Sequence, residues 1–164
     1  KTIKLLAVSR RKEEGYLAAV CPWLVALDNP LASVNDVYNA VFVRSNMLGD
    51  TMYYGKGAGK LPTASAVAAD VIDCAKNQGR HIACGWEVEN AKLLDFSGMQ
   101  HRFFVRAAQS QENLVDQLFG QIEKIRLDAY PEEFGFLTGP MAEKEFDEKK
   151  NKLPGFIGRL RIKE

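Results

Sequence analysis

A glycine-rich segment between a strand pattern and a helix pattern constrains this chain more than any other part of its sequence. Residues 50–54 (DTMYY) predict a strand, residues 55–59 (GKGAG) follow, and apolar residues then recur every three or four positions from Ala64 to Ala75. Glycine allows close approach of the backbone to a ligand, and free N–H groups at a helix start favour negative charge. The pattern predicts either a phosphate-contacting loop or a turn that packs a helix against a sheet.

Two common phosphate-binding motifs are excluded at this loop. A Walker A loop needs Ser or Thr after its Lys, whereas Leu61 follows Lys60 here, and Tyr54 stands where the first glycine would be. The dinucleotide fingerprint G-x-G-x-x-G fails because Lys60 occupies the third glycine position. The local pattern therefore leaves both interpretations open.

Short apolar runs separated by turn residues predict strands before the loop. Residues 2–8 and 16–26 predict one hairpin, and residues 37–43 and 50–54 predict a second pair of strands. Because the connections are short, we expect an antiparallel-rich sheet accompanied by one helix. Residues 80–97 show no clean period and predict a linker.

The part after the linker, residues 98–164, has its own order of elements. Strand and helix patterns follow one another as β-α-β-β-α-β, the ferredoxin-like split arrangement. The predicted segments are strand 101–107, helix 111–125, strands 126–130 and 134–138, helix 142–153 and strand 156–162. We expect the charged run 143–152 to form a solvated helix face, and His101 to have a surface or capping role. The fold class is α+β.

Charge and cysteine content exclude several classes of partner. The net charge is only +1, from 22 basic and 21 acidic residues, so we expect no nucleic-acid or membrane partner. Three cysteines without a C-x-x-C pair predict neither a disulfide framework nor a zinc site, and hence a reducing, cytoplasmic location. His81 and Cys84 have a metal-like spacing, but no second pair follows, so no metal site is expected. The chain begins with Lys1 in a strand pattern, and we expect it to be a piece of a longer protein.

A series of motifs in fixed order resembles homoserine dehydrogenase between about Asp28 and Asn77. The motifs are NPLASVN (29–35), YNA (38–40), GDTMYYG (49–55), GAG (57–59) and PTASAV (62–67). The resemblance implies part of an NAD(P)-dependent oxidoreductase that interconverts L-aspartate 4-semialdehyde and L-homoserine in threonine, methionine and isoleucine biosynthesis. Residues 1–79 would be the end of its substrate and dimerisation domain. The nucleotide-binding domain and catalytic lysines would lie upstream, so the resemblance implies no catalytic residue here, an inactive isolated chain, and a homodimer or higher homo-oligomer.

The resemblance also implies two binding sites. By this resemblance, the residues expected to contact the cofactor, NADP or NAD, are Gly57, Ala58, Gly59 and Thr63. Residues 98–164 look like an ACT domain, the amino-acid-sensing module, whose effector binds at the turn after the first strand. Here that turn lacks the family's Asp/Arg-Pro-Gly run, and the candidate L-threonine contacts are Gln109, Gln111 and Asn113. A non-enzymatic amino-acid-binding module or a purely structural dimerisation module is the alternative.

Overall fold

The computed structural model describes residues 1–80, 85, 89–120 and 122–163, which form two compact units. One unit contains residues 1–26 and 91–164, and the other contains residues 27–90. The domain boundaries predicted at residues 79 and 98 are drawn from resemblance to a family and not from contacts within the chain. They therefore stay a prediction. The predicted linker, 80–97, lies partly outside the described residues.

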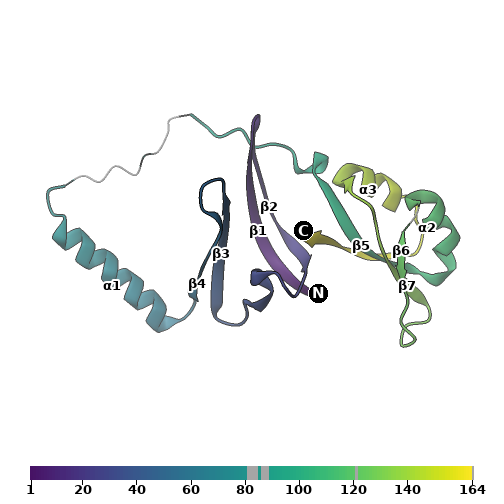
Figure 1. The fold of residues 1–164 in the computed structure, drawn as a ribbon, viewed down its shortest axis with the longest axis horizontal. Helices are drawn as coiled ribbons and strands as arrows, with labels where there is room; N and C mark the ends of the chain where they lie inside the picture. The colour runs from purple at the N-terminus through teal and green to yellow at the C-terminus, as the bar shows by residue number, and fades with distance from the viewer. Residues whose placement is uncertain (81–84, 86–88, 121, 164) are drawn as a thin grey trace. The chain divides into compact units, whose positions relative to one another are not determined.

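The first unit is built on a mixed sheet with the strand order β1-β2-β9-β5-β7-β6 (Figure 1). Its strands are β1 (Thr2–Lys12), β2 (Gly15–Val25), β5 (Gln100–Ala108), β6 (Glu123–Ile125), β7 (Glu133–Leu137) and β9 (Phe156–Lys163), with the two-residue β8 (Met141–Ala142) paired to the start of β5. Neighbouring strands are antiparallel except β2 and β9, which are parallel over three residue pairs, from Trp23–Arg161 to Val25–Lys163.

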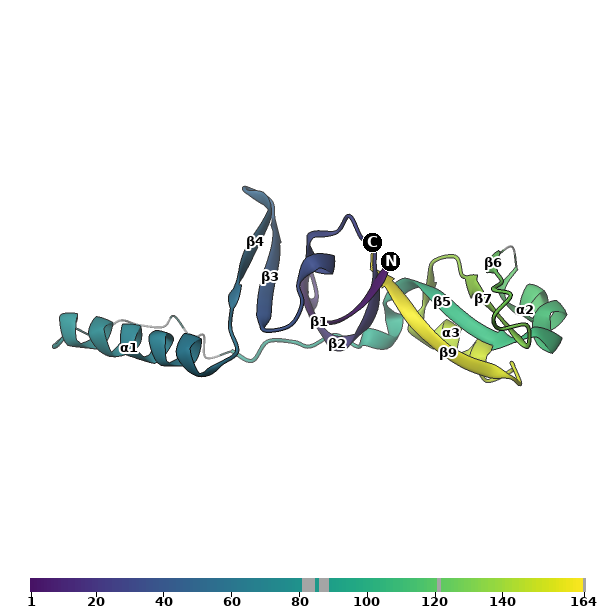
Figure 2. The same cartoon turned by 90° about the horizontal axis from the view of Figure 1, so that it is seen from below.

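Two helices complete the predicted β-α-β-β-α-β order, in which α2 (Glu112–Phe119) follows β5 and α3 (Glu143–Lys150) precedes β9. Figure 2 shows β9 running beside β5, its partner in the sheet. Alternate residues of a strand share a face, so the buried residues Phe103, Val105 and Ala107 of β5 face the same core. Core residues from the other elements are Val115, Phe119, Phe134, Phe136, Met141, Phe146 and Leu153.

The helix predicted over 111–125 is too long. The helix α2 ends at Phe119, because Gly120 adopts φ 73° and turns the chain away. Residues 123–125 then form β6, which pairs with β7, and the predicted strand 126–130 is not one. Ile122 and Ile125 continue the apolar spacing of the helix, and this continuation explains the error.

The second unit contains a separate hairpin followed by a helix. Strands β3 (Tyr38–Ser45) and β4 (Gly49–Lys56) pair along their whole length, after a short 3₁₀ turn, η1 (Pro30–Ser33), which Asn29 caps. The helix α1 (Lys60–Lys76) is rich in alanine, the best helix former, and has no buried residue. Its exposed apolar side chains are Leu61, Val67, Val71 and Ile72. None of the helices in the described segments is long and apolar enough to cross a membrane.

Candidate functional site

The glycine loop, residues 57–59, connects β4 to α1, and its two glycines differ in conformation and surroundings. Gly59 is the N-cap of α1 with φ 116° and ψ 156°, a conformation that side-chain-bearing residues rarely adopt. Gly57 lies against β3, where a Cβ atom would collide with the side-chain amide of Asn39. Glycine is therefore favoured by backbone conformation at Gly59, and a side chain at position 57 would require Asn39 to move.

The first turn of α1 leaves backbone donors that have no acceptor within the helix. Thr63 donates two hydrogen bonds to the carbonyl oxygen of Gly59, from its N–H at 3.2 Å and from Oγ1 at 2.9 Å. Pro62 has no N–H, so Lys60 and Leu61 supply the N–H groups that lack an acceptor within the helix. An anion here would meet these two donors and the positive end of the helix dipole.

The strand ends that carry the loop are stiffened by aromatic packing. The rings of Tyr38 and Tyr54 stack with centroids 4.9 Å apart and planes 5° from parallel. The ammonium nitrogen of Lys56 lies 5.7 Å from the Tyr38 centroid. At the far end of the hairpin, Arg44 forms a bidentate pair with Asp50, at 2.7 and 3.0 Å. The loop is thus attached to strand ends that side-chain contacts stabilise.

The loop and the start of α1 gather the residues for which cofactor contact was predicted. The predicted contacts Gly57, Ala58, Gly59 and Thr63 are brought together and are all exposed. They differ in role, because the Thr63 hydroxyl hydrogen is directed at the Gly59 carbonyl and so holds the loop. In the part of the chain that the structure describes, no group of three or more His, Cys, Asp and Glu could hold a metal ion. The His81–Cys84 pair lies outside it.

The predicted effector turn follows β5 and is tied to its neighbours. The N–H of Ala108 donates to the carbonyl of Gly155 at 2.9 Å, and that of Gln109 donates to the carbonyl of Glu132 at 2.8 Å. The side chain of Gln111 packs beside Gly155, whereas Asn113 is exposed on α2. The candidate contacts are therefore divided between the turn, which holds Gln109 and Gln111, and the first turn of α2, which holds Asn113.

The cationic side chains near this turn are already paired with a carboxylate of the chain, that of Glu112. Glu112 accepts hydrogen bonds from Lys124 Nζ at 2.9 Å, from Gln109 Nε2 at 2.6 Å, and from Arg126. The bonds from Lys124 and Arg126 lower the pKa of Glu112 to about 2. Lys124 also pairs with Asp116 at 2.7 Å, and these acceptors raise the pKa of its ammonium. An effector carboxylate would compete with Glu112 for the same donors.

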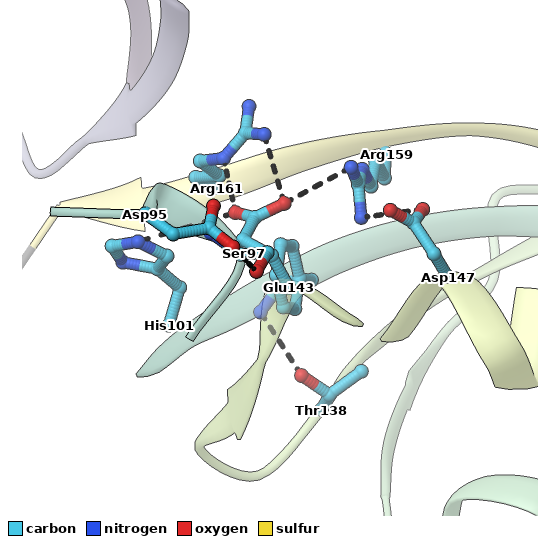
Figure 3. A network of polar contacts seen from close by, with 9 residues as sticks. Asp95, Ser97, His101, Thr138, Glu143, Asp147, Arg159 and Arg161 are labelled. Atoms are coloured by element: carbon cyan, nitrogen blue, oxygen red, sulfur yellow. Dashed lines mark hydrogen bonds and ion pairs between the residues drawn. The ribbon is translucent and has the colours of Figure 1, made fainter. Parts of the chain in front are cut away.

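A buried ionic network, missed by the sequence analysis, centres on Glu143 at the start of α3 (Figure 3). Its side chain accepts hydrogen bonds from Arg161 Nε at 2.5 Å and Nη2 at 2.9 Å, and pairs with Arg159 Nη2 at 3.0 Å. Only 4% of Glu143 is exposed, so the prediction of a solvated face is wrong for this residue. The available signal was the alternation in β9, which places both arginines on the helix-covered face.

His101 is also buried, contrary to the expected surface or capping role. It is 8% exposed, and its Nε2 lies 3.9 Å from Glu143 Oε1. Its ring meets Trp23 of β2 edge-on, with centroids 5.1 Å apart, and Phe96 at 5.3 Å. The residue therefore lies where the β1–β2 hairpin meets the rest of its unit.

Comparison with known proteins finds similarity to homoserine dehydrogenases. Residues 1–72 match the family model of homoserine dehydrogenase. The homoserine dehydrogenase of Neisseria gonorrhoeae is 53% identical over 74 residues, which are 45% of this chain and 17% of that protein. That of Mycobacterium tuberculosis is 48% identical over 82 residues, 47% of this chain and 19% of that protein. The chain spans less than a fifth of these curated relatives.

Solved structures extend the likeness to nearly the whole chain. The homoserine dehydrogenase of Thiobacillus denitrificans matches with a TM-score of 0.79 and 26% identity, over 99% of this chain and 42% of that one. The S. aureus enzyme at pH 6.5 matches with a TM-score of 0.70 and 23% identity, over 99% and 41%, and this second likeness concerns the fold alone.

Proposed function

We infer that this chain works as a portion of a homoserine dehydrogenase, because residues 1–72 belong to that family. The proposed whole protein interconverts L-aspartate 4-semialdehyde and L-homoserine with NADP or NAD. The family match carries this proposal, and it includes β3, β4, the glycine loop and most of α1. The loop supports it physically, since Gly59 holds a conformation for which glycine is suited.

Within that enzyme, we propose that the loop positions the cofactor and performs no proton transfer. The backbone of residues 57–59 and the N–H groups of Lys60 and Leu61 would hold an anionic part of NADP or NAD, while Thr63 keeps the Gly59 carbonyl in place. When bound, the reduced nicotinamide would supply a hydride to the aldehyde, and the oxidised form would accept one from the alcohol. The reaction also needs an acid for the developing alkoxide, and we assign none to this chain. We therefore expect no homoserine oxidation by the isolated chain.

A chimera tests the proposal directly. Residues 1–72 would replace the matching segment of the Neisseria gonorrhoeae enzyme, and oxidation of L-homoserine would be followed with NAD and with NADP. We expect an active chimera. In it, Gly59→Ala should raise the KM for the cofactor, whereas the control Gly55→Ala should not, since Gly55 has open space around its Cβ position. A correctly assembled but inactive chimera would contradict the proposal.

For residues 98–164 we propose an ACT-type regulatory module that binds L-threonine where the turn after β5 enters α2, through Gln109, Gln111 and Asn113. The β-α-β-β-α-β order supports this module. Calorimetry of the full chain should give saturable heat with L-threonine, but not with L-homoserine or NADPH, and Asn113→Ala should weaken it. Absence of heat from a folded sample would favour the structural alternative.

We also propose that the protein is a homodimer or a higher homo-oligomer. Support comes from α1, where large apolar side chains such as Val67 and Val71 are more than half exposed. Sedimentation of the chain, with Val71→Lys as the variant and Lys76→Glu as a charge control on the same helix, should show loss of association for Val71→Lys alone.

A further inference from the structure

The β1–β2 hairpin is attached to the C-terminal strands by a short contact, here called the joint. The joint consists of Trp23 on β2, His101 on β5, Phe96 and the β9 residues Arg161–Lys163. Its backbone pairing covers only the three residue pairs from Trp23–Arg161 to Val25–Lys163. At the other end of the hairpin, Tyr16 exchanges two backbone hydrogen bonds with Lys92 and Leu94, each 2.8 Å long.

Among the described residues, two polar nitrogens buried at the joint have no hydrogen-bond partner. Trp23 is 2% exposed, and neither its Nε1 nor Nε2 of His101 has a hydrogen-bond partner within the described residues. Both side chains line a cavity of about 10 Å³, roughly the space of one water molecule. Leu17 and Ala19 of the hairpin form part of its wall. The His101 ring is thus an element of the contact surface that the hairpin covers.

The charges facing His101 oppose the addition of a proton. Glu143 of α3 is the acid near it, and that carboxylate is already engaged by Arg161 and Arg159 of β9. Arg10 of β1 adds a further positive charge from the hairpin side. Burial lowers the pKa of His101, Glu143 raises it, and the three arginines lower it further, so that the net shift is downward.

We propose that the joint is an acid-sensitive contact in which protonation of His101 releases the β1–β2 hairpin from the C-terminal strands. A protonated ring would place a third buried cation beside one carboxylate and against Trp23. The device goes beyond the proposed function, since it requires neither cofactor nor effector. His101 acts in it as a positioning residue.

The direction of the pH dependence follows from linkage. With the hairpin released, His101 titrates near its ordinary value of about 6.5, whereas the closed joint binds the proton only at lower pH. The closed joint is therefore fully favoured above about pH 6.5 and loses stability as the pH falls below it. Between the two pKa values, the ratio of open to closed joint rises about tenfold for each pH unit.

The test uses the full chain with Trp86→Phe, which leaves Trp23 as its sole tryptophan. Trp23 emission and amide exchange, corrected for intrinsic rates, would be followed from pH 8 to 5. We expect a reversible red shift below about pH 6.5, with lost protection at residues 23–25 and 161–163. Exchange at the core residues Val105 and Phe136 should stay slow.

Two variants and one direct titration decide the interpretation. His101→Gln, which cannot be protonated, should abolish the transition, and His81→Gln, at the other histidine of the sequence, should retain it. In the parent chain, NMR of the His101 ring should give a pKa below about 6.5. A transition that persists in His101→Gln overturns the proposal. So does a ring pKa at or above 6.5, or unchanged exchange at residues 23–25 while the ring titrates.

Discussion

Removing the carboxylate of Glu143 should cost far more stability than removing a neighbouring surface carboxylate. Glu143→Ala leaves the guanidinium groups of Arg159 and Arg161 without their shared acceptor, in side chains only 20% and 17% exposed. Loss of one partner of a buried ion pair costs about 3–5 kcal/mol. Because Arg159 keeps a second acid, Asp147, at 3.3 Å, we expect the lower end, about 3 kcal/mol.

Urea unfolding, followed by Trp23 emission in the Trp86→Phe background, measures this loss. With a slope of about 2 kcal/mol per molar urea, the midpoint should fall by about 1.5 M. The matched control is Glu145→Ala on the same helix, whose half-exposed side chain pairs with Lys149 at 2.8 Å and contributes about 0.3–0.5 kcal/mol. Equal midpoint shifts for the two variants would refute the argument that the Glu143 network is a buried, stabilising one.

Three further substitutions follow from the packing and the charges. Gly135→Ala would place a Cβ 2.7 Å from the Phe104 ring and should lower the Tm, whereas Gly139→Ala, with open space around it, should not. Because the pKa of Glu112 is lowered to about 2, its stabilising contribution is present above about pH 4.5 and is lost as the pH falls toward 2. The stability of the Glu112→Gln variant, measured by acid unfolding, should therefore depend less on pH in that range. Phe146→Ala removes a fully buried ring and should cost about 3–5 kcal/mol in urea unfolding, and a loss below about 1 kcal/mol would contradict the assigned core.

Elements defined by short-range signals could be predicted from the sequence. Both hairpins, the helix after the glycine loop and the β-α-β-β-α-β order all depend on turn residues and apolar periods within a few positions. The end of α2 could not be placed, since the apolar spacing continues through Ile122 and only the left-handed conformation of Gly120 stops the helix. A glycine within an apolar period is a weak signal compared with the period itself.

Contacts between distant segments could not be predicted in this way, because the alternation of a strand shows which residues share a face but not which segment covers that face. The parallel pairing of β2 with β9 joins segments near the two ends of the chain, and no local pattern in either strand specifies a partner. For the same reason Glu143 was assigned to a solvated face. Its burial is set by Arg159 and Arg161, which come from another strand and meet it only in the folded sheet.

The candidate cofactor loop likewise has features that the sequence could predict and features that it could not. Motif matching brought out Gly57 and Gly59, and the structure supplies separate physical reasons for each. The Asn39 amide that lies against Gly57 belongs to β3, not to the strand that leads into the loop. This contact therefore depends on the register of β3 with β4, in which Asn39 faces Gly55. The bracing bonds from Thr63 to the Gly59 carbonyl likewise follow from the helix start rather than from residue type alone.

The sheet topology also indicates how residues 98–164, the C-terminal module, and the β1–β2 hairpin can influence each other. Because β2 joins the sheet through β9, the hairpin and the module share one layer of strands. Glu143 anchors β9 to α3 through Arg161, the residue that pairs with Trp23. A shift of α3 would therefore act on the joint through a short chain of buried contacts, and weakening the joint would leave the module folded around its own aromatic core while releasing the hairpin.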